Sequence, residues 1–335
     1  MKNRFVLAAM AAIFAVSGAA AAASPLTLDR TIALPGVRGK FDHFAIDEAG
    51  QRLFASATGA REVLVIDLAS GKLAQALSGF GKPHGIVWDA ATMRLFVTDG
   101  VKGELDVFAG VPLVRTASIK LAEDADDMAF DSARHLLYVG NGGTNAANPP
   151  SVAVVDTATL SVVKKLPAST HPEGLDIDAG RGRIFVNIAD SAEVLAIDGR
   201  KQAIAQTWRL AGARDNTPIA DDAADDRLFV GCRKPARLVA LDAETGKEIA
   251  SAKADSGVDD LFFDAAMRRV YFIAGAGRVD VYGVAKDGKL TALAGAETAA
   301  GVKTGLFVAS QSRLYVGIPG SAQDASIRVY ATSGK

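Results

Sequence analysis

One short phrase recurs seven times along the chain, and its spacing constrains the fold more than any other feature. The phrase is an aliphatic residue followed by an aromatic residue, usually with arginine in front. Its aromatic members are Phe54, Phe96, Tyr138, Phe185, Phe229, Tyr271 and Tyr315, at intervals of 42 to 47 residues. A period of this length predicts supersecondary units that bury a core only by stacking on their neighbours.

Each unit contains four short apolar segments separated by turn residues. In the first unit these segments are 44–46, 53–55, 63–67 and 73–77, with Asp, Gly and Ser between them. Short apolar segments bounded by such residues predict a four-stranded antiparallel meander. Seven meanders arranged radially make an all-β, seven-bladed β-propeller.

The two ends of the repeat array predict how the ring closes. The last repeat stops after its third strand, 327–330, and an additional strand, 26–34, precedes the first repeat. We expect the N-terminal strand to complete the last blade, because an open edge strand invites aggregation. One propeller domain therefore covers 24–335.

The first 23 residues have the pattern of a secretory signal peptide. Lys2 and Arg4 precede an apolar stretch, 5–16, and the alanines 21–23 form a cleavage site before Ser24. No later segment has the roughly 20 apolar residues that a membrane helix needs. We therefore expect a periplasmic or secreted protein without a membrane span.

Charge and cysteine content disfavour several classes of function. The formal net charge is −1 and no run of Lys or Arg occurs, so the sequence provides no basic field for nucleic acid. Cys232 is the only cysteine, which excludes an internal disulfide and a C-x-x-C-H haem site. We expect Cys232 to be a small buried side chain in a strand, and the protein to be a monomer.

A second regularity lies six residues before the aliphatic residue of each phrase. Aspartate occupies this position in six repeats, Asp47, Asp89, Asp131, Asp178, Asp222 and Asp264, and Val308 occupies it in the last. In five repeats the Asp faces the arginine of the phrase across a predicted hairpin turn. A feature of nearly every blade belongs to the scaffold, so we interpret the pair as a turn fastener worth about 0–1 kcal/mol rather than as a catalytic ring.

Several segments resemble a known family. Leu95–Asp99, Leu137–Asn141 and Ile184–Asn187 are similar to the Tyr-Val-Thr-Asn repeat of bacterial YVTN propellers. Val65–Asp67 together with Ser70–Lys72 resembles the YncE-like branch, and the resemblance spans all seven repeats, 41–330. It implies an exported propeller and carries no catalytic motif. One branch of the family is associated with single-stranded DNA binding.

Function should lie where the repeats differ, on the face that carries the loops leading into the innermost strands. Five residues before the repeated Asp, the seven repeats have Asp42, His84, Asp126, Glu173, Thr217, Asp259 and Lys303. We expect these side chains and their neighbours to meet at one mouth of the central channel. The candidate ligand-binding residues are Asp42, His43, His84, Asp126, Asp127, His171, Glu173, Asp259, Asp260 and Lys303.

Three interpretations of this rim stay open. The first is a divalent metal, Ca²⁺, Mn²⁺ or Zn²⁺, held by members of the set Asp42, His84, Asp126, Glu173 and Asp259. The second is general acid–base catalysis, because crowded carboxylates drive one another's pKa apart. In the third, Lys303 neutralises some of the acids and the others accept backbone N–H bonds. No HExxH, GxSxG or DxDxDG pattern selects among them.

Two loops between second and third strands, 140–150 and 318–325, are longer than the others and should lie on the same face. Such loops act as lids or binding surfaces, or are tolerated insertions. The leading hypothesis is an exported binding or interaction protein that holds a small ligand, a peptide or a partner at the rim. The alternatives are a metal-dependent lactonase or lyase-type enzyme, and a single-stranded DNA-binding propeller, which would need a basic groove with exposed aromatics.

Overall fold

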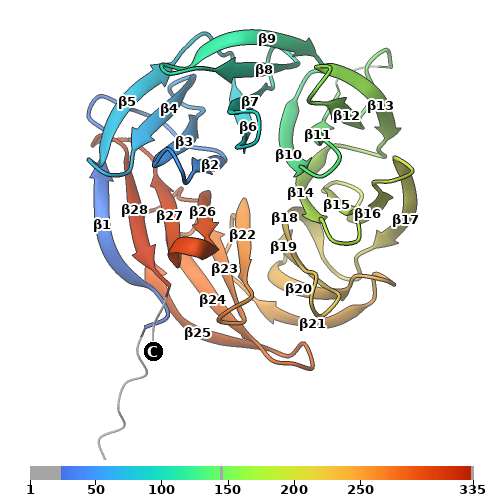
Figure 1. Cartoon of the computed structure of the whole chain (residues 1–335). Helices are drawn as coiled ribbons and strands as arrows, with labels where there is room; N and C mark the ends of the chain where they lie inside the picture. Colours follow the sequence, from blue (N-terminus) through green and yellow to red (C-terminus); the bar gives the residue numbers. More distant parts are fainter. Residues whose placement is uncertain (1–23, 144–145, 333–335) are drawn as a thin grey trace, which may run out of the picture.

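Seven four-stranded antiparallel sheets stand in a ring (Figure 1). The computed structural model describes residues 24–143 and 146–332. The chain is a seven-bladed β-propeller, as the repeats predict. Across the described ranges no helix is long and apolar enough to span a membrane. The predicted signal peptide, 1–23, lies outside the described residues.

The strands follow the chain from the inside of each blade to its outside. Blade 1 contains β2 (Phe44–Asp47), β3 (Arg52–Ala57), β4 (Glu62–Asp67) and β5 (Lys72–Leu77). Blade 2 contains β6 (Pro83–Asp89), β7 (Arg94–Asp99), β8 (Glu104–Ala109) and β9 (Val114–Lys120). Blade 3 contains β10 (Ala125–Asp131), β11 (Leu136–Asn141), β12 (Ser151–Asp156) and β13 (Ser161–Pro167). Blade 4 contains β14 (Pro172–Asp178), β15 (Arg183–Ile188), β16 (Glu193–Asp198) and β17 (Ala203–Arg209).

The remaining blades include the one that closes the ring. Blade 5 contains β18 (Arg214–Asp222), β19 (Arg227–Lys234), β20 (Ala236–Asp242) and β21 (Glu248–Lys253). Blade 6 contains β22 (Asp260–Asp264), β23 (Arg269–Ala274), β24 (Arg278–Val284) and β25 (Leu290–Glu297). Blade 7 contains β26 (Gly305–Val308), β27 (Arg313–Ile318), β28 (Ser326–Ala331) and, as its outermost strand, β1 (Thr27–Ala33).

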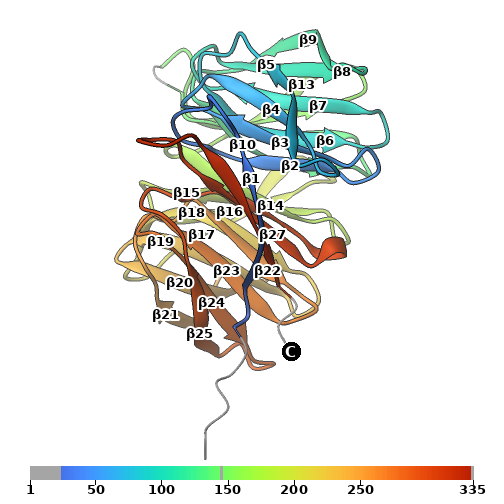
Figure 2. The same cartoon turned by 90° about the vertical axis from the view of Figure 1, so that its left-hand side faces the viewer.

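Strand β1 closes the ring by pairing with β28. The antiparallel register runs from Thr27 opposite Ala331 to Ala33 opposite Ser326. In the side view of Figure 2, β1 runs along the red strands of the C-terminal end of the chain. The N-terminal strand therefore completes the last blade, as predicted.

The aromatic residues of the repeated phrase pack between blades. Phe229 in β19 lies 5.0 Å, centroid to centroid, from Phe263 in β22, and Tyr271 in β23 lies 5.3 Å from Phe307 in β26. In each pair the second strand of one blade contacts the first strand of the next. Phe229 and Tyr271 are fully buried, so the phrase contributes to the core.

The repeated aspartate caps the hairpin turn, and its arginine has a more variable role than predicted. The Asp47 carboxylate accepts the Gly50 N–H at 2.9 Å, and equivalent bonds hold the turns of Asp131, Asp178 and Asp264. The register places Asp and Arg opposite each other in all five repeats. Only Asp47–Arg52 and Asp178–Arg183, among these described pairs, form ion pairs. Elsewhere the arginine reaches a backbone carbonyl, as Arg269 does to Thr332 at 3.2 Å.

The seventh repeat, which has Val308 at the aspartate position, turns differently. A 3₁₀ turn, η1 (Ala309–Gln311), follows Val308 directly. No side chain caps its first residue. The absence of the aspartate in the sequence thus coincides with a change in the local backbone.

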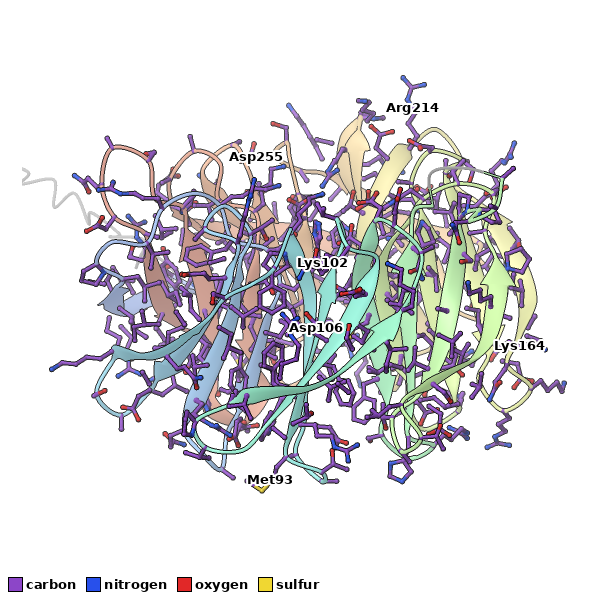
Figure 3. The ribbon with its side chains drawn as sticks, turned by 90° about the horizontal axis from the view of Figure 1, so that it is seen from above. Met93, Lys102, Asp106, Lys164, Arg214 and Asp255 are labelled. Atoms are coloured by element: carbon purple, nitrogen blue, oxygen red, sulfur yellow. The ribbon has the colours of Figure 1, made fainter. Side chains whose placement is uncertain are left out.

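The two faces of the ring are distinct in Figure 3, which views the molecule with the ring axis upright. Met93 lies in a turn of the lower face, whereas Arg214, the first residue of β18, and Asp255, in the loop that leads into β22, lie on the upper face. The described residues of the two longer loops that pair with other segments do so on this upper face, as predicted, and residues 144–145 of the first loop lie outside the described ranges. The Gly142 N–H donates to the Asp124 carbonyl at 2.9 Å, and Gly320 pairs with Gly39.

Candidate functional site

A cavity of about 220 Å³ occupies the upper mouth of the channel. Nearly all of the side chains that line it are charged or are imidazoles. They are Lys40, Asp42, His43, Lys82, His84, Asp126, Asp127, Glu173, Arg233, Asp259 and Lys303, with Gly174 and Thr217. Pockets for drug-sized ligands measure about 300–1,000 Å³. The mouth pocket therefore suits a small polar ligand or ions.

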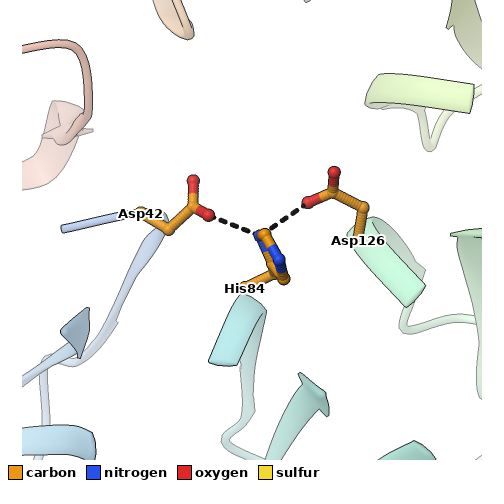
Figure 4. A group of neighbouring side chains, drawn as sticks. All are labelled: Asp42, His84 and Asp126. Atoms are coloured by element: carbon orange, nitrogen blue, oxygen red, sulfur yellow. Dashed lines mark hydrogen bonds and ion pairs between the residues drawn. The ribbon is translucent and has the colours of Figure 1, made fainter. Parts of the chain in front are cut away.

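His84 lies between two carboxylates at one side of this pocket (Figure 4). Its Nδ1 is 2.5 Å from Oδ2 of Asp42 and 3.1 Å from Oδ1 of Asp126. The side chain of His84, in β6, is 5% exposed. Asp42 precedes β2 and Asp126 lies in β10, so three consecutive blades each provide one group. The repeat position therefore places all three at the same height in the channel.

A second imidazole, His171, lies on the other oxygen of Asp126. Its Nε2 is 3.3 Å from Asp126 Oδ2 and 3.8 Å from Glu173 Oε1. Its Nδ1 is 3.1 Å from Oδ2 of Asp124, a residue of the loop before β10. The histidine thus has carboxylates at both ring nitrogens.

Glycines at the mouth allow the inner strands to approach one another. A Cβ on Gly85 would stand 2.5 Å from the Asp126 carbonyl oxygen, and a Cβ on Gly174 would stand 2.4 Å from that of Thr217. Both contacts are shorter than real Cβ atoms tolerate. The sequence has Gly next to His84 and Glu173 because neighbouring blades meet there.

His43 lies at the waist of the channel, the level at which it lines both the mouth pocket and a second cavity. Its Nδ1 is 3.2 Å from Asp260 Oδ1, and its Nε2 is 3.7 Å from Asp42 Oδ1 and 3.9 Å from Asp127 Oδ1. Backbone N–H groups of Met128 and Leu175 donate to Asp127 at 2.8 and 3.1 Å. The Gly305 N–H donates to Asp260 at 2.8 Å, so the carboxylates of Asp127 and Asp260 are both held by the scaffold as well as by the histidine.

The opposite side of the mouth is cationic. Arg233, near the end of β19, contacts the Asp259 carboxylate, and Lys303 Nζ is 3.4 Å from Asp259 Oδ2. Burial lowers the pKa of Lys303, and the nearby Arg233 lowers it further. Asp259 therefore belongs to a cationic cluster and is set apart from the imidazoles.

The carboxylates of the acidic side stabilise positive charge on the two imidazoles. Burial alone would lower the pKa of His84, but hydrogen bonds to Asp126 and Asp42 outweigh it and raise the pKa to about 9. The same balance, with bonds to Asp124 and Asp126, raises the pKa of His171 to about 10. Burial raises the pKa of Glu173. The acidic side of the mouth thus favours cations.

Below the waist lies the second cavity, of about 400 Å³, whose lining combines apolar residues with His43 and five carboxyls: Asp127, Asp176, Asp221, Asp259 and Asp260. Asp176 and Asp221 are the two of these carboxyls that do not line the mouth pocket and do not contact His43. Asp176 accepts the backbone N–H of Asp221 at 2.7 Å, and Asp221 Oδ1 is buried with no hydrogen-bond partner among the described residues. Burial raises the pKa of Asp176 to about 6. Burial, with repulsion from Asp176, raises the pKa of Asp221 to about 7.

We expect Asp221→Asn to stabilise the protein at pH 8. A carboxyl whose pKa rises on folding holds protons more tightly in the folded state, so stability falls as pH rises from about 4 to 7. Removing that charge should return roughly 1–3 kcal/mol at pH 8 after allowance for solvent screening. Thermal melts at pH 5 and pH 8 test this: the gain should shrink at pH 5. Asp190→Asn, on an exposed residue, is the control, and an equal gain there would contradict the prediction.

The structure brings all ten of the candidate residues predicted from the repeats to the mouth and waist of the channel. His84 and His171 join the carboxylates of Asp42, Asp126 and Glu173, while His43 lies with Asp127 and Asp260 at the waist and also contacts Asp42. Of the predicted metal-ligand set, Asp259 lies with Arg233 and Lys303 instead.

The sequence interpretation missed four residues of the mouth: Lys40, Lys82, Asp124 and Arg233. Lys40, Lys82 and Asp124 each lie two residues before a candidate at the ring position, as His171 does. Extending the repeat comparison by two residues would have found them. Arg233 comes from a second strand, and no signal in the first strands indicates it.

Comparison with known proteins supports the fold and identifies no family or function. No protein-family model matches the sequence, and no curated protein does. A chain in a structure titled "Crystal Structure of Mitotic Checkpoint Complex" is similar, with a TM-score of 0.77 at 14% identity, and the match covers 99% of each chain. As 1691 solved chains match this chain, the fold is common and does not decide the function.

Proposed function

We propose that the protein is an exported binding protein that holds a small ligand in the mouth pocket of the channel. The division of charge within this pocket carries the proposal. One side has Asp42, Asp126 and Glu173 with two imidazoles and with Lys82, whose Nζ is 3.8 Å from Asp124 Oδ1. The other side has Arg233 and Lys303 around the single carboxylate of Asp259. A ligand with an anionic group and a cationic group, or an anion beside a bound metal ion, would satisfy both sides.

The scaffold agrees with this use. Seven-bladed propellers are general interaction scaffolds, and the similar chain reported above comes from a structure of a complex. The secretory pattern of 1–23 supports export to the periplasm or beyond. A peptide or protein partner that inserts a charged side chain into the same pocket would use the same residues.

The proposal predicts that the cationic side is essential for holding an anionic group. We expect the double variant Arg233→Ala/Lys303→Ala to bind such a ligand at least tenfold more weakly. The two substitutions remove both cations that would donate charge-assisted hydrogen bonds to the anionic group of the ligand. Thermal shifts with succinate, citrate, glutamate and lysine, followed by titration calorimetry of any that binds, measure the effect.

Lys234→Ala is the matched control. Lys234 neighbours Arg233 but pairs with Asp215 at 2.7 Å and does not line the mouth pocket. The Lys234→Ala variant should bind the ligand as tightly as the unaltered protein does. Equal loss in both variants, or no shift with any of the four compounds, would argue against a binding role for this pocket.

A second candidate is a metal-dependent lactonase or lyase-type enzyme. The observation that favours it is the convergence of His84 Nδ1 with the oxygens of Asp42 and Asp126. A divalent cation held there would act as a Lewis acid on a carbonyl oxygen. Hydrolysis of simple γ- and δ-lactones with and without added Zn²⁺, with Asp126→Asn as the control, tests this candidate.

A further inference from the structure

The Asp126 carboxylate belongs to two separate groups of metal-ligating atoms. Its Oδ1 faces His84 Nδ1 at 3.1 Å, and its Oδ2 faces His171 Nε2 at 3.3 Å. Asp42 completes the first group and Glu173 the second, and the donor atoms within each group lie within 4.8 Å of one another. One carboxylate thus presents one oxygen to each of two imidazoles.

We propose that the channel mouth binds two divalent cations of the zinc or manganese class, with Asp126 as the bridging ligand. The first cation would be held by Asp42, His84 and Asp126, and the second by Asp126, His171 and Glu173. The inference deepens the proposed function, because it rests on the mouth pocket being the binding site. Mixed imidazole and carboxylate donors suit these cations better than Ca²⁺, which takes oxygen ligands.

The distances suit cations in both places. Donors about 2.0–2.2 Å from a zinc ion in a tetrahedron lie about 3.3–3.6 Å from one another. The separations between imidazole nitrogen and carboxylate oxygen are 2.5 and 3.1 Å in the first group, and 3.3 and 3.8 Å in the second. Small movements of the side chains bring all of them to bonding range.

A proton on His84 satisfies only part of the first group. The single hydrogen of His84 Nδ1 has two carboxylate oxygens from different residues in front of it, and can donate well to only one. A cation in the same place accepts a lone pair from the nitrogen and from both oxygens at once. His84 is 4% exposed, so water cannot readily donate a hydrogen bond to the carboxylate oxygen that Nδ1 leaves without one.

The surroundings of the two histidines differ, and this predicts unequal affinities. His171 has a carboxylate, Asp124, 3.1 Å from the nitrogen that faces away from the cation, the arrangement that orients a metal-binding imidazole and raises its basicity. His84 Nε2 is buried beside Gly100 and lacks a hydrogen-bond partner within the described ranges. We therefore expect the His171 position to fill first.

Each cation would have three protein donors and at least one open coordination position. Open positions are typical of sites that bind a substrate or ligand rather than purely structural ones. Arg233 and Lys303 line the same pocket. An anionic ligand group would therefore meet the cations on one side and these two residues on the other.

Zinc stoichiometry of the purified protein tests the inference. After chelator treatment, dialysis against ZnCl₂ and removal of free metal, elemental analysis should give two zinc ions per chain. His84→Gln and His171→Gln should each retain about one, and calorimetry should show the tighter step lost only in His171→Gln. Asp126→Asn should weaken both steps at least tenfold. Asp259→Asn, in the same pocket but outside both groups, should retain two.

Manganese gives an independent readout that does not depend on any activity. Two Mn²⁺ ions bridged by a carboxylate couple magnetically, so the doubly loaded protein should show a coupled paramagnetic resonance spectrum. The single-histidine variants should show the spectrum of an isolated ion. Circular dichroism and melting of the metal-free variants identify any that fail to fold, and only folded variants are compared.

Several results would overturn the inference. A measured content of one zinc ion or none per chain of the unaltered protein would overturn it. So would two zinc ions that bind Asp126→Asn as tightly as they bind the unaltered protein. The proposed function fails by a different result: zinc binds as described but none of the four test compounds binds in either the metal-free or the metal-loaded form. If a test compound binds the metal-free protein but the protein binds no zinc, the two-cation proposal is rejected and the proposed binding function stands.

Discussion

A chain that begins at Gly36, and so lacks β1, should lose its cooperative melting transition or melt at least about 10 °C lower. Strand β1 pairs with β28 from Thr27 to Ala33 and contributes the buried Ile32, with Leu34 following it. Each buried aliphatic side chain contributes about 1.5–3 kcal/mol, and each kcal/mol corresponds to about 2–4 °C in a domain of this size class. Removal also exposes β28 as an open edge.

A synthetic peptide of residues 24–35 provides the control. Supplied in excess to the truncated chain, it should pair with β28 and restore the melting temperature in a concentration-dependent way. A scrambled peptide of the same composition should not. A truncated chain that melts like the complete one, with no change in aggregation, would mean that blade 7 does not need β1.

The fold could be predicted from the sequence because nearly every blade repeats the same pattern of strand and turn residues. The aliphatic–aromatic phrase marks the second strand, and Asp47 and its equivalents mark the turn before it. The spare N-terminal strand and the incomplete last repeat indicate ring closure, which the pairing of β1 with β28 confirms. Because the pattern repeats, the strands, the turns and the closure of the ring can be recognised without knowledge of long-range contacts.

The site was only partly predictable, and the reason is geometric. The repeat position locates Asp42, His84 and Asp126 at the same height in neighbouring blades, so their convergence follows from the ring. It does not give side-chain direction. His84 turns toward the pocket with Nδ1, whereas Asp259 turns to Arg233, a residue contributed by a second strand. Which acids meet imidazoles and which meet cations depends on these contacts between blades.

Gly142→Ala should weaken zinc binding at the His171 position by about 10–100-fold without removing any charged or ligating group. Gly142 follows β11 in the long upper loop, and a Cβ there would stand 2.2 Å from His171 Nδ1 and 2.7 Å from Asp124 Oδ2. Neither contact is possible, so His171 must leave Asp124. Loss of such an orienting carboxylate costs about 10–100-fold in metal affinity.

Gly180→Ala is the matched control, because its Cβ would meet only Asp178 Oδ1 at an ordinary 3.5 Å in a turn of the lower face. Calorimetric titration with ZnCl₂ should show the tighter step weakened in Gly142→Ala and both steps unchanged in Gly180→Ala. Melting temperatures of the metal-free proteins should differ little, since the added Cβ would meet side-chain atoms of His171 and Asp124 and no atom of the apolar core. Unchanged zinc affinity in Gly142→Ala would mean that Asp124 does not orient His171.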